Sequence, residues 1–175
     1  MPTEAMILRI FLLGGFRLEY EGRTIDIPRR ESLLRLFTRL LLESDHPLPR
    51  KMLAYTLWPD MPEAEALTNL RRHLYLIRQL LPPAHQEQLV ISPRSVTWKS
   101  SPLCWLDVAD FERAKGDLSA LEAAASLYRG DLTSGVDIDE AILARREELR
   151  NRHFDLLKDL ARRGLESGEH EYGLG

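Results

Sequence analysis

The sequence predicts an α+β domain over residues 1–102, followed by an all-α helical domain over residues 103–175. Short β-favouring stretches interrupted by glycines open the chain, whereas from Asp107 onward strand signals vanish and helical periodicity dominates. The charge changes near the same place. Residues 1–100 hold 14 Lys and Arg against 11 Asp and Glu, net +3, and residues 101–175 hold 10 against 16, net −6. The positive charge is therefore local, as an electrostatic footprint on DNA would be.

Three short antiparallel strands and two helices are expected before residue 60. Residues 7–27 are β-favouring and are broken at Gly14-Gly15 and at Glu21-Gly22, which favour tight turns. Pro28 opens a helical stretch that ends before His46-Pro47, and its apolar stripe predicts one buried face. A shorter second helix starts at residues 49–51 and stops at Pro59. The apolar stripe of the first helix consists of Leu33, Leu34, Phe37, Leu40 and Leu41.

The third helix is the most informative stretch of the chain. It opens at Pro62, with acidic residues in its first turn, and ends at Pro82-Pro83. At 100° per residue, its polar face separates cleanly from its apolar stripe. Between residues 69 and 99 there are five basic residues and one acid, Glu87. The stripe is Leu67, Leu70, Leu74, Ile77 and Leu81; Thr68, Arg72, Tyr75 and Gln79 point away from it, with Arg71 and Asn69 on its flanks.

A hairpin follows, with two β-rich arms around Ser92-Pro93-Arg94-Ser95. Strands, three helices with the longest last, and then a hairpin form the order of a winged helix-turn-helix. In that fold the third helix enters the DNA major groove. We therefore expect Thr68, Arg71, Arg72 and Tyr75 to approach base edges, and His73 and Arg78 to contact phosphates. The alternative is a plain amphipathic surface helix with solvated arginines.

Other basic residues are candidate backbone contacts. At the hairpin, Arg94, Ser95 and Lys99 are expected to reach a phosphate or the minor groove, although charged hairpin tips also keep sheet edges soluble. Arg50 and Lys51 start the second helix, where they could hold a phosphate together with its N-terminal amides. Solvated charges at a helix start are the equally plain alternative.

The second half is expected to be helical throughout. Residues 102–106 are expected to form a linker, and helices are predicted over residues 109–114 and 118–128. A helix pair is predicted over residues 139–152 and 154–166. Small residues in this pair would let the helices approach closely. Its apolar set is Ala141, Leu143, Ala144, Leu149, Leu156, Leu157, Leu160 and Ala161.

Several other classes of protein find no support in the sequence. The single cysteine, Cys104, excludes an internal disulfide framework and suits a reducing cytoplasm. The five histidines lack metal-ligand spacing, and the common phosphate-loop, nucleophile-elbow and dinucleotide motifs are absent, so we expect no metal, cofactor or catalytic residue. The longest apolar runs are too short to span a membrane.

Taken together, these motifs resemble a known family, the bacterial regulators called SARP or AfsR-like proteins. These proteins join an OmpR-type winged helix to a bacterial transcriptional activator domain. The first half is similar through LRIFLLGGFRLEYEGRTIDIPRRESLLRLFTRLLLES at residues 8–44, LWPD at 57–60 and NLRRHLYLIRQLL at 69–81. The second half is similar through WLDVADFERA at 105–114, LYRGDL at 127–132 and AILARREELRNRHFDLLKDLARRGLESGEH at 141–170.

The resemblance implies a DNA-binding transcriptional activator whose helical domain is tetratricopeptide-like. It implies that side-by-side protomers read direct repeats in double-stranded DNA and that the protein contacts RNA polymerase. A repeat array would continue with another helix, so we expect the helical domain to be incomplete at residue 175. A rival hypothesis is an interaction scaffold, in which the helical array binds a protein or ligand and the winged helix is a docking module. The acidic second half fits that hypothesis equally well.

Overall fold

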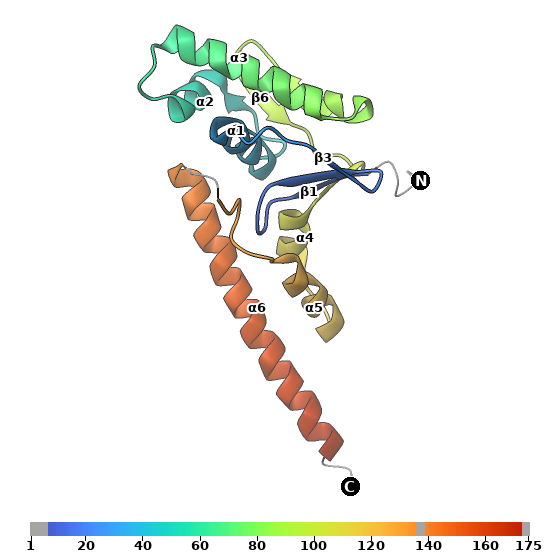
Figure 1. Ribbon diagram of the computed structural model, residues 1–175. Coiled ribbons are helices and arrows are strands. Elements are labelled where there is room, and N and C mark those ends of the chain that lie inside the picture. The colour runs from blue at the N-terminus through green and yellow to red at the C-terminus, as the bar shows by residue number, and fades with distance from the viewer. Residues whose placement is uncertain (1–6, 136–138, 173–175) are drawn as a thin grey trace.

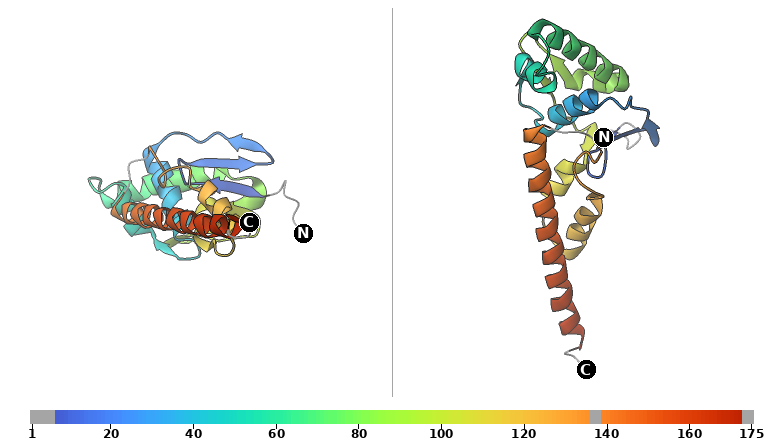
Figure 2. Two further views of the ribbon diagram at one scale, coloured as in Figure 1. Left: turned by 90° about the horizontal axis from the view of Figure 1, so that it is seen from below. Right: turned by 60° about the vertical axis from the view of Figure 1, so that its left-hand side comes forward.

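A computed structural model describes residues 7–135 and 139–172 of the chain, with side chains described as far as Glu166. A mixed α/β region comes first and helices follow, as predicted at this level. Figure 1 shows helices α1 and α3 on one side of strand β1 and helices α4 and α5 on the other. The long helix α6 starts near α1 and runs past α5, and the views in Figure 2 show the same arrangement.

The first sheet contains the three predicted strands and one more. Strands β1 (Leu8–Phe11), β2 (Arg17–Tyr20) and β3 (Arg23–Ile25) pair antiparallel, as expected. Strand β7 (Cys104–Leu106) pairs parallel with β1 on its other edge, which gives the order β3-β2-β1-β7. The prediction of a linker over residues 102–106 was therefore wrong. An unpaired edge of β1 next to an apolar Cys-Trp-Leu segment favours pairing, and the backbone amide of Leu8 donates to the carbonyl of Leu103 at 2.9 Å.

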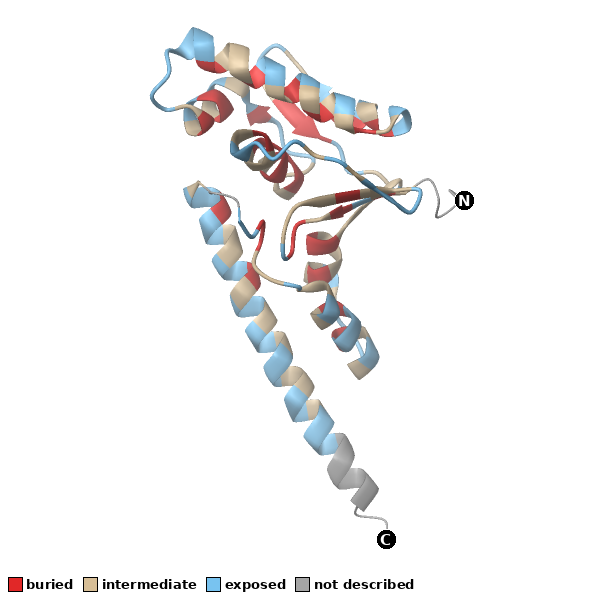
Figure 3. Ribbon diagram, viewed as in Figure 1, coloured by how far each residue is buried: buried red, intermediate tan, exposed pale blue. Residues whose placement is uncertain are grey.

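Three helices and a small second sheet follow the first three strands. The apolar stripes of α1 and α3 pack against each other, and Figure 3 shows their buried residues on the inner sides. Phe37 of α1 and Trp98 of the hairpin, both almost fully buried, pack with ring centroids 5.4 Å apart. The second sheet has the order β4-β6-β5. These elements are α1 (Glu31–Leu42), β4 (Leu48–Pro49), α2 (Arg50–Leu57), α3 (Glu63–Leu80), the 3-10 helix η2 (Pro83–Gln88), β5 (Leu89–Ile91) and β6 (Ser95–Trp98).

The second half contains α4 (Asp107–Arg113), α5 (Leu118–Leu127) and α6 (Glu140–Tyr172). The predicted helix pair over residues 139–152 and 154–166 is in fact one continuous helix. The helix is continuous because residues 150–156 contain neither proline nor glycine, so nothing ends it there. Of the predicted apolar set only Leu149 is buried, and Ile142 is buried beside it. Most of the remaining set is exposed along α6 (Figure 3): Ala141, Leu143, Ala144, Leu157 and Ala161.

The two halves meet in a closely packed junction. Both carboxylate oxygens of Asp107 accept from the backbone amide of Leu12, and one also accepts from that of Leu13 at 2.9 Å. The amide of Thr133 donates to the carbonyl of Leu12 at 2.7 Å, and Leu13 forms a β-bridge with Leu132. At the other side of the junction, Arg39 of α1 pairs with Asp139, which lies just before α6, at 3.4 Å. Hydrogen bonds and an ion pair therefore connect the sheet and α1 to the second half.

Candidate nucleic-acid interface

The exposed face of α3 carries three of the four residues predicted to read bases. Arg71 and Arg72 are exposed, and Tyr75 exposes 63% of its surface. The fourth, Thr68, is half-buried and donates from its hydroxyl to the carbonyl of Ala64 at 2.9 Å. Arg71 contacts the Thr68 hydroxyl at 3.4 Å. Because α3 has no acidic residue after Glu65, this face is positively charged around Arg71 and Arg72.

Next to α3, basic side chains from three separate elements surround one hollow of about 560 Å³. Arg50 and Lys51 come from the start of α2, Arg71 comes from α3, and Arg94 comes from the tip of the hairpin. Pro49, Leu67 and Pro93 complete its walls. We call this feature the cationic hollow. Four positive groups around one concave surface give it a positive potential that attracts anions.

Backbone hydrogen bonds fix the hairpin tip against α2. The amide of Arg50 donates to the carbonyl of Arg94 at 2.9 Å, and the Arg50 guanidinium donates to the carbonyl of Ser92 at 3.2 Å. Within the tip, the Ser95 amide donates to the Ser92 hydroxyl at 2.9 Å, and the two hydroxyls are also 2.9 Å apart. These contacts fix the backbone of the tip at Arg94, whose side chain is exposed.

Three of the predicted contacts have other partners within the protein. Ser95 is half-buried and its hydroxyl stabilises the turn. Lys99 lies beyond the far end of β6, beside Asp45; hydrogen bonds from Ser100, together with the charge of Lys99, lower the pKa of Asp45. Lys51 is in the hollow, but it pairs with Glu63 at 2.8 Å. Such an exposed pair is worth about 1 kcal/mol or less, so a phosphate could replace the carboxylate.

His73 and Arg78 face the body of the protein instead of the cationic hollow. Nδ1 of His73 lies 2.8 Å from the carbonyl oxygen of Asn69, which can only accept, so Nδ1 carries the proton. Nε2 then accepts from the hydroxyl of Ser32 at 2.8 Å, and burial lowers the pKa of His73. Arg78 donates to the carbonyl of Leu89 at 2.8 Å. A phosphate contact by His73 would require breaking one of its internal hydrogen bonds.

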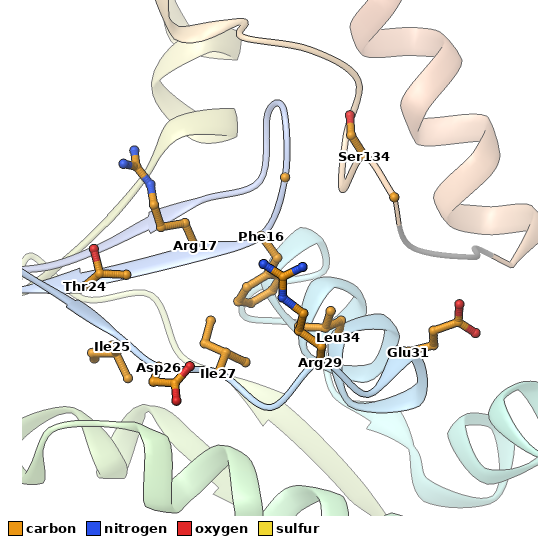
Figure 4. Close-up of a pocket in the computed structure, with 12 residues that line it drawn as sticks. Phe16, Arg17, Thr24, Ile25, Asp26, Ile27, Arg29, Glu31, Leu34 and Ser134 are labelled. Carbon is orange, nitrogen blue, oxygen red and sulfur yellow. The ribbon is translucent and has the colours of Figure 1, made fainter.

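A larger hollow, of about 730 Å³, lies between the first sheet and the start of α1 (Figure 4). Its walls carry charges of both signs, including Arg29, Asp26 and Glu31, and none of the predicted site residues lines it. In Figure 4, Arg17 points away from Ile25, Ile27 and Leu34. This hollow has no constellation that favours one kind of ligand.

The sequence indicated most members of the cationic hollow but did not show that they converge. The pairing that brings them together is β4 with β6, in which Leu48 lies opposite Val96 and Pro49 opposite Ser95. A two-residue strand leaves almost no pattern in a sequence, so this pairing had no usable signal. Among the residues that the structure describes, no group of His, Cys, Asp and Glu has the arrangement of a metal site. Nor does any helix in the described ranges have the length and apolarity needed to cross a bilayer.

Comparisons with known proteins found one family model and similar solved structures. Residues 107–174 match the family model described as the bacterial transcriptional activator domain. Among solved structures, the chain is similar to EmbR of Mycobacterium tuberculosis, in a complex with a low-affinity phosphopeptide. The TM-score is 0.60, with 18% identity over 88% of this chain. The chain spans 42% of the length of that EmbR chain. No curated protein is similar enough to count as a match.

Proposed function

We propose that this protein binds specific DNA sequences and regulates transcription in the bacterial cytoplasm. Its similarity to the SARP-like bacterial transcriptional regulators supports the proposal. Residues 1–102 act as a winged helix-turn-helix, with α3 in the major groove and the β5–β6 hairpin as the wing. Residues 103–175 act as the activator domain. The partners are promoter DNA, RNA polymerase and a second protomer on an adjacent repeat.

The cationic hollow is the observation that carries this proposal. It adjoins the exposed face of α3, so one backbone phosphate held among Arg50, Arg71 and Arg94 would place that face over the neighbouring base edges. The major groove is about 12 Å wide, which admits a helix. Arg72 and Tyr75, further along the exposed face, are then positioned to contact bases. Arg71 lies between them and the hollow, so it can contact either a phosphate or a base.

The distribution of charge supports the same orientation. α3 carries no acid after its first turn, and the acidic residues of the chain concentrate in the second half, at net −6. A polyanion is therefore attracted to the first half and repelled by the second. The activator domain stays free to contact a protein while α3 is on DNA.

Selection of bound sites from random duplexes tests the proposal directly. We expect enrichment of a short motif repeated in direct orientation, with a spacing that reports how adjacent protomers sit. Affinity for the selected site should fall steeply with salt, because each phosphate contact releases about one counterion. The matched control is Arg23→Ala, since Arg23 is exposed on β3 and lies outside the interface. An empty selection with salt-independent, weak binding would instead favour the interaction scaffold.

A further inference from the structure

One face of the first sheet presents arginines together with aromatic rings. The strand register places Arg9 opposite both Glu19 and Trp105, and Phe11 opposite Arg17, so these side chains share a face. The other face of the sheet is the core side, where Leu8, Ile10 and Leu18 are fully buried. Arg129, from the segment after α5, joins the first face. We define the arginine–aromatic face as Arg9, Phe11, Arg17, Trp105 and Arg129.

The guanidinium groups on this face lie over aromatic rings. Arg9 is 5.4 Å from the ring centroid of Trp105, and Arg17 and Arg129 are 3.9 Å and 5.8 Å from that of Phe11. The two rings pack edge to face at 5.2 Å. A guanidinium stacked in this way is held in one orientation, while the N–H groups along its edge stay available to a pair of oxygens.

Glu19 demonstrates that a carboxylate fits such a group. Its Oε1 atom lies 2.8 Å from Nη1 of Arg17, the guanidinium that is closest to its ring. Arg9 and Arg129 lie further from their rings than Arg17 does and are exposed, yet neither has an ion pair within the described residues. The nearby carboxylate of Asp110 is already engaged by Trp105 and Arg113. Within the described part of the chain, Arg9 and Arg129 therefore have no carboxylate at ion-pair distance, although the charge of Arg129 acts on the buried Asp107.

We propose that the arginine–aromatic face binds an acidic peptide segment of a partner protein. Carboxylates of the segment pair with Arg9 and Arg129, and an apolar residue between them covers the half-buried rings of Phe11 and Trp105. Charge-assisted, bidentate pairs of this kind give both affinity and geometric specificity. This inference does not depend on the proposed DNA binding.

The position of the face favours a peptide over DNA. Trp105 donates from its indole nitrogen to Asp110 of α4, so the face lies on the α4 side of the sheet, whereas α3 lies beyond α1 on the opposite side (Figure 1). DNA bound to α3 would not reach it.

The test uses the full chain and two labelled peptides, one of alternating glutamate and leucine and one in which glutamine replaces glutamate. Fluorescence anisotropy should show binding of the glutamate peptide and a loss of binding at high salt, with the glutamine peptide bound far more weakly. Arg9→Glu and Arg129→Glu should each lower the affinity about tenfold, as expected for one lost charge-assisted pair. The matched control is Arg23→Glu, an exposed arginine on the same sheet but on its other side, which should change the affinity less than about twofold.

Four results would overturn the proposal. Equal binding of the two peptides, or an equal loss in Arg23→Glu, would show that no specific carboxylate site exists. Displacement of the peptide by random duplex DNA, with weaker DNA binding by Arg9→Glu, would make the face part of a nucleic-acid surface. Self-association that Arg9→Glu abolishes would assign the face to a second copy of the chain. DNA affinity is measured on the same variants, and each variant is checked for an unchanged Tm. This separates failure of the peptide proposal from failure of the proposed DNA binding.

Discussion

Arg72 and Arg94 occupy different parts of the interface and should therefore fail in different ways. Arg72 lies on the exposed face of α3, whereas Arg94 lines the cationic hollow at the hairpin tip. In the proposed complex Arg72 contacts a base edge, so we expect Arg72→Ala to weaken binding to the cognate site by about 1–3 kcal/mol and to relax base preference. Arg94→Ala should weaken all sequences alike and reduce the salt slope by about 1. Gel shifts over a series of sites and salt concentrations distinguish these outcomes, and equal effects on specificity would contradict the assignment.

Asp107 is the buried carboxylate at the junction of the two halves. It is 1% exposed and accepts from the amides of Leu12, Leu13 and Val108. Burial raises the pKa of Asp107 above its ordinary value of 3.8, although these three amides pull in the other direction. The folded chain therefore retains a proton at this carboxyl over a pH range in which the unfolded chain has lost it.

The sign of the resulting pH dependence follows from proton linkage. From pH 3.8 upward to the raised pKa, the folded state binds more protons at Asp107, so the free energy of unfolding should fall as pH rises and then level off. Asp107→Asn should remove this contribution, whereas Asp26→Asn, at an exposed carboxylate, should keep it. Denaturant titrations at a series of pH values measure the difference. The prediction would be contradicted if the difference in the free energy of unfolding between the wild type and Asp107→Asn did not change with pH across this range.

At the scale of elements, the turn between β1 and β2 packs tightly against the segment before α6. Gly14 has φ +95°, and its amide donates to the carbonyl of Asp131 at 3.0 Å. A Cβ atom at this position would lie 3.0 Å from both the carbonyl carbon and the Cβ of Arg129. Gly22, in the next turn, has φ +74° but no atom within 4 Å of such a Cβ. The two glycines share a backbone requirement and differ in packing.

Alanine at these two glycines should separate backbone strain from close approach. Gly22→Ala should destabilise the fold by about 1 kcal/mol, the cost of a left-handed conformation for a residue with a side chain. Gly14→Ala adds a contact that the backbone of residue 129 must move to relieve, so we expect a total of about 2–3 kcal/mol. Chemical denaturation with a fixed m-value measures both. Equal losses would mean that the junction yields easily at residue 129.

Elements with a long periodic pattern could be predicted from the sequence. The short strand β7 and the continuity of α6 could not. The stripes of α1 and α3 and the turns at Gly14 and Gly22 each leave a local signal. β7 has three residues and forms because β1 has an open edge, which is a property of the assembled sheet. α6 continues through residue 153 because residues 150–156 contain no proline or glycine, so the predicted break between two helices is not there.

At the scale of the whole molecule, the two halves should unfold together. β7, Asp107, the Leu13–Leu132 bridge and the Arg39–Asp139 pair all cross between them. Calorimetry should therefore show one transition, with equal calorimetric and van't Hoff enthalpies. Amides of β1 and α4 should exchange with a common opening free energy, and those near the far end of α6 should exchange faster. Two resolved transitions would show that the junction is weaker than its contacts indicate.

At the candidate interface, too, some features follow from local sequence and others depend on tertiary contacts. The shared exposed face of Arg71, Arg72 and Tyr75 could be predicted from the sequence, because helical spacing alone fixes which side chains lie together. The inward orientation of His73 and Arg78 depends on Ser32 and on the carbonyls of Asn69 and Leu89, which pattern alone does not place. Likewise, Arg50 and Arg94 become neighbours only when Pro49 and Ser95 pair across a two-residue strand.

The parallel pairing of β1 with β7 also sets an order for folding. Leu8 pairs with Cys104, so the first sheet is completed only after the three helices and the hairpin have been synthesised. Until then β1 presents an open edge, which can pair with another chain. Closing so long a loop is slow compared with forming local contacts. Nascent chains that stop short of residue 104 should therefore be the form of this protein most prone to aggregation, and a chaperone would be needed chiefly before that point in translation.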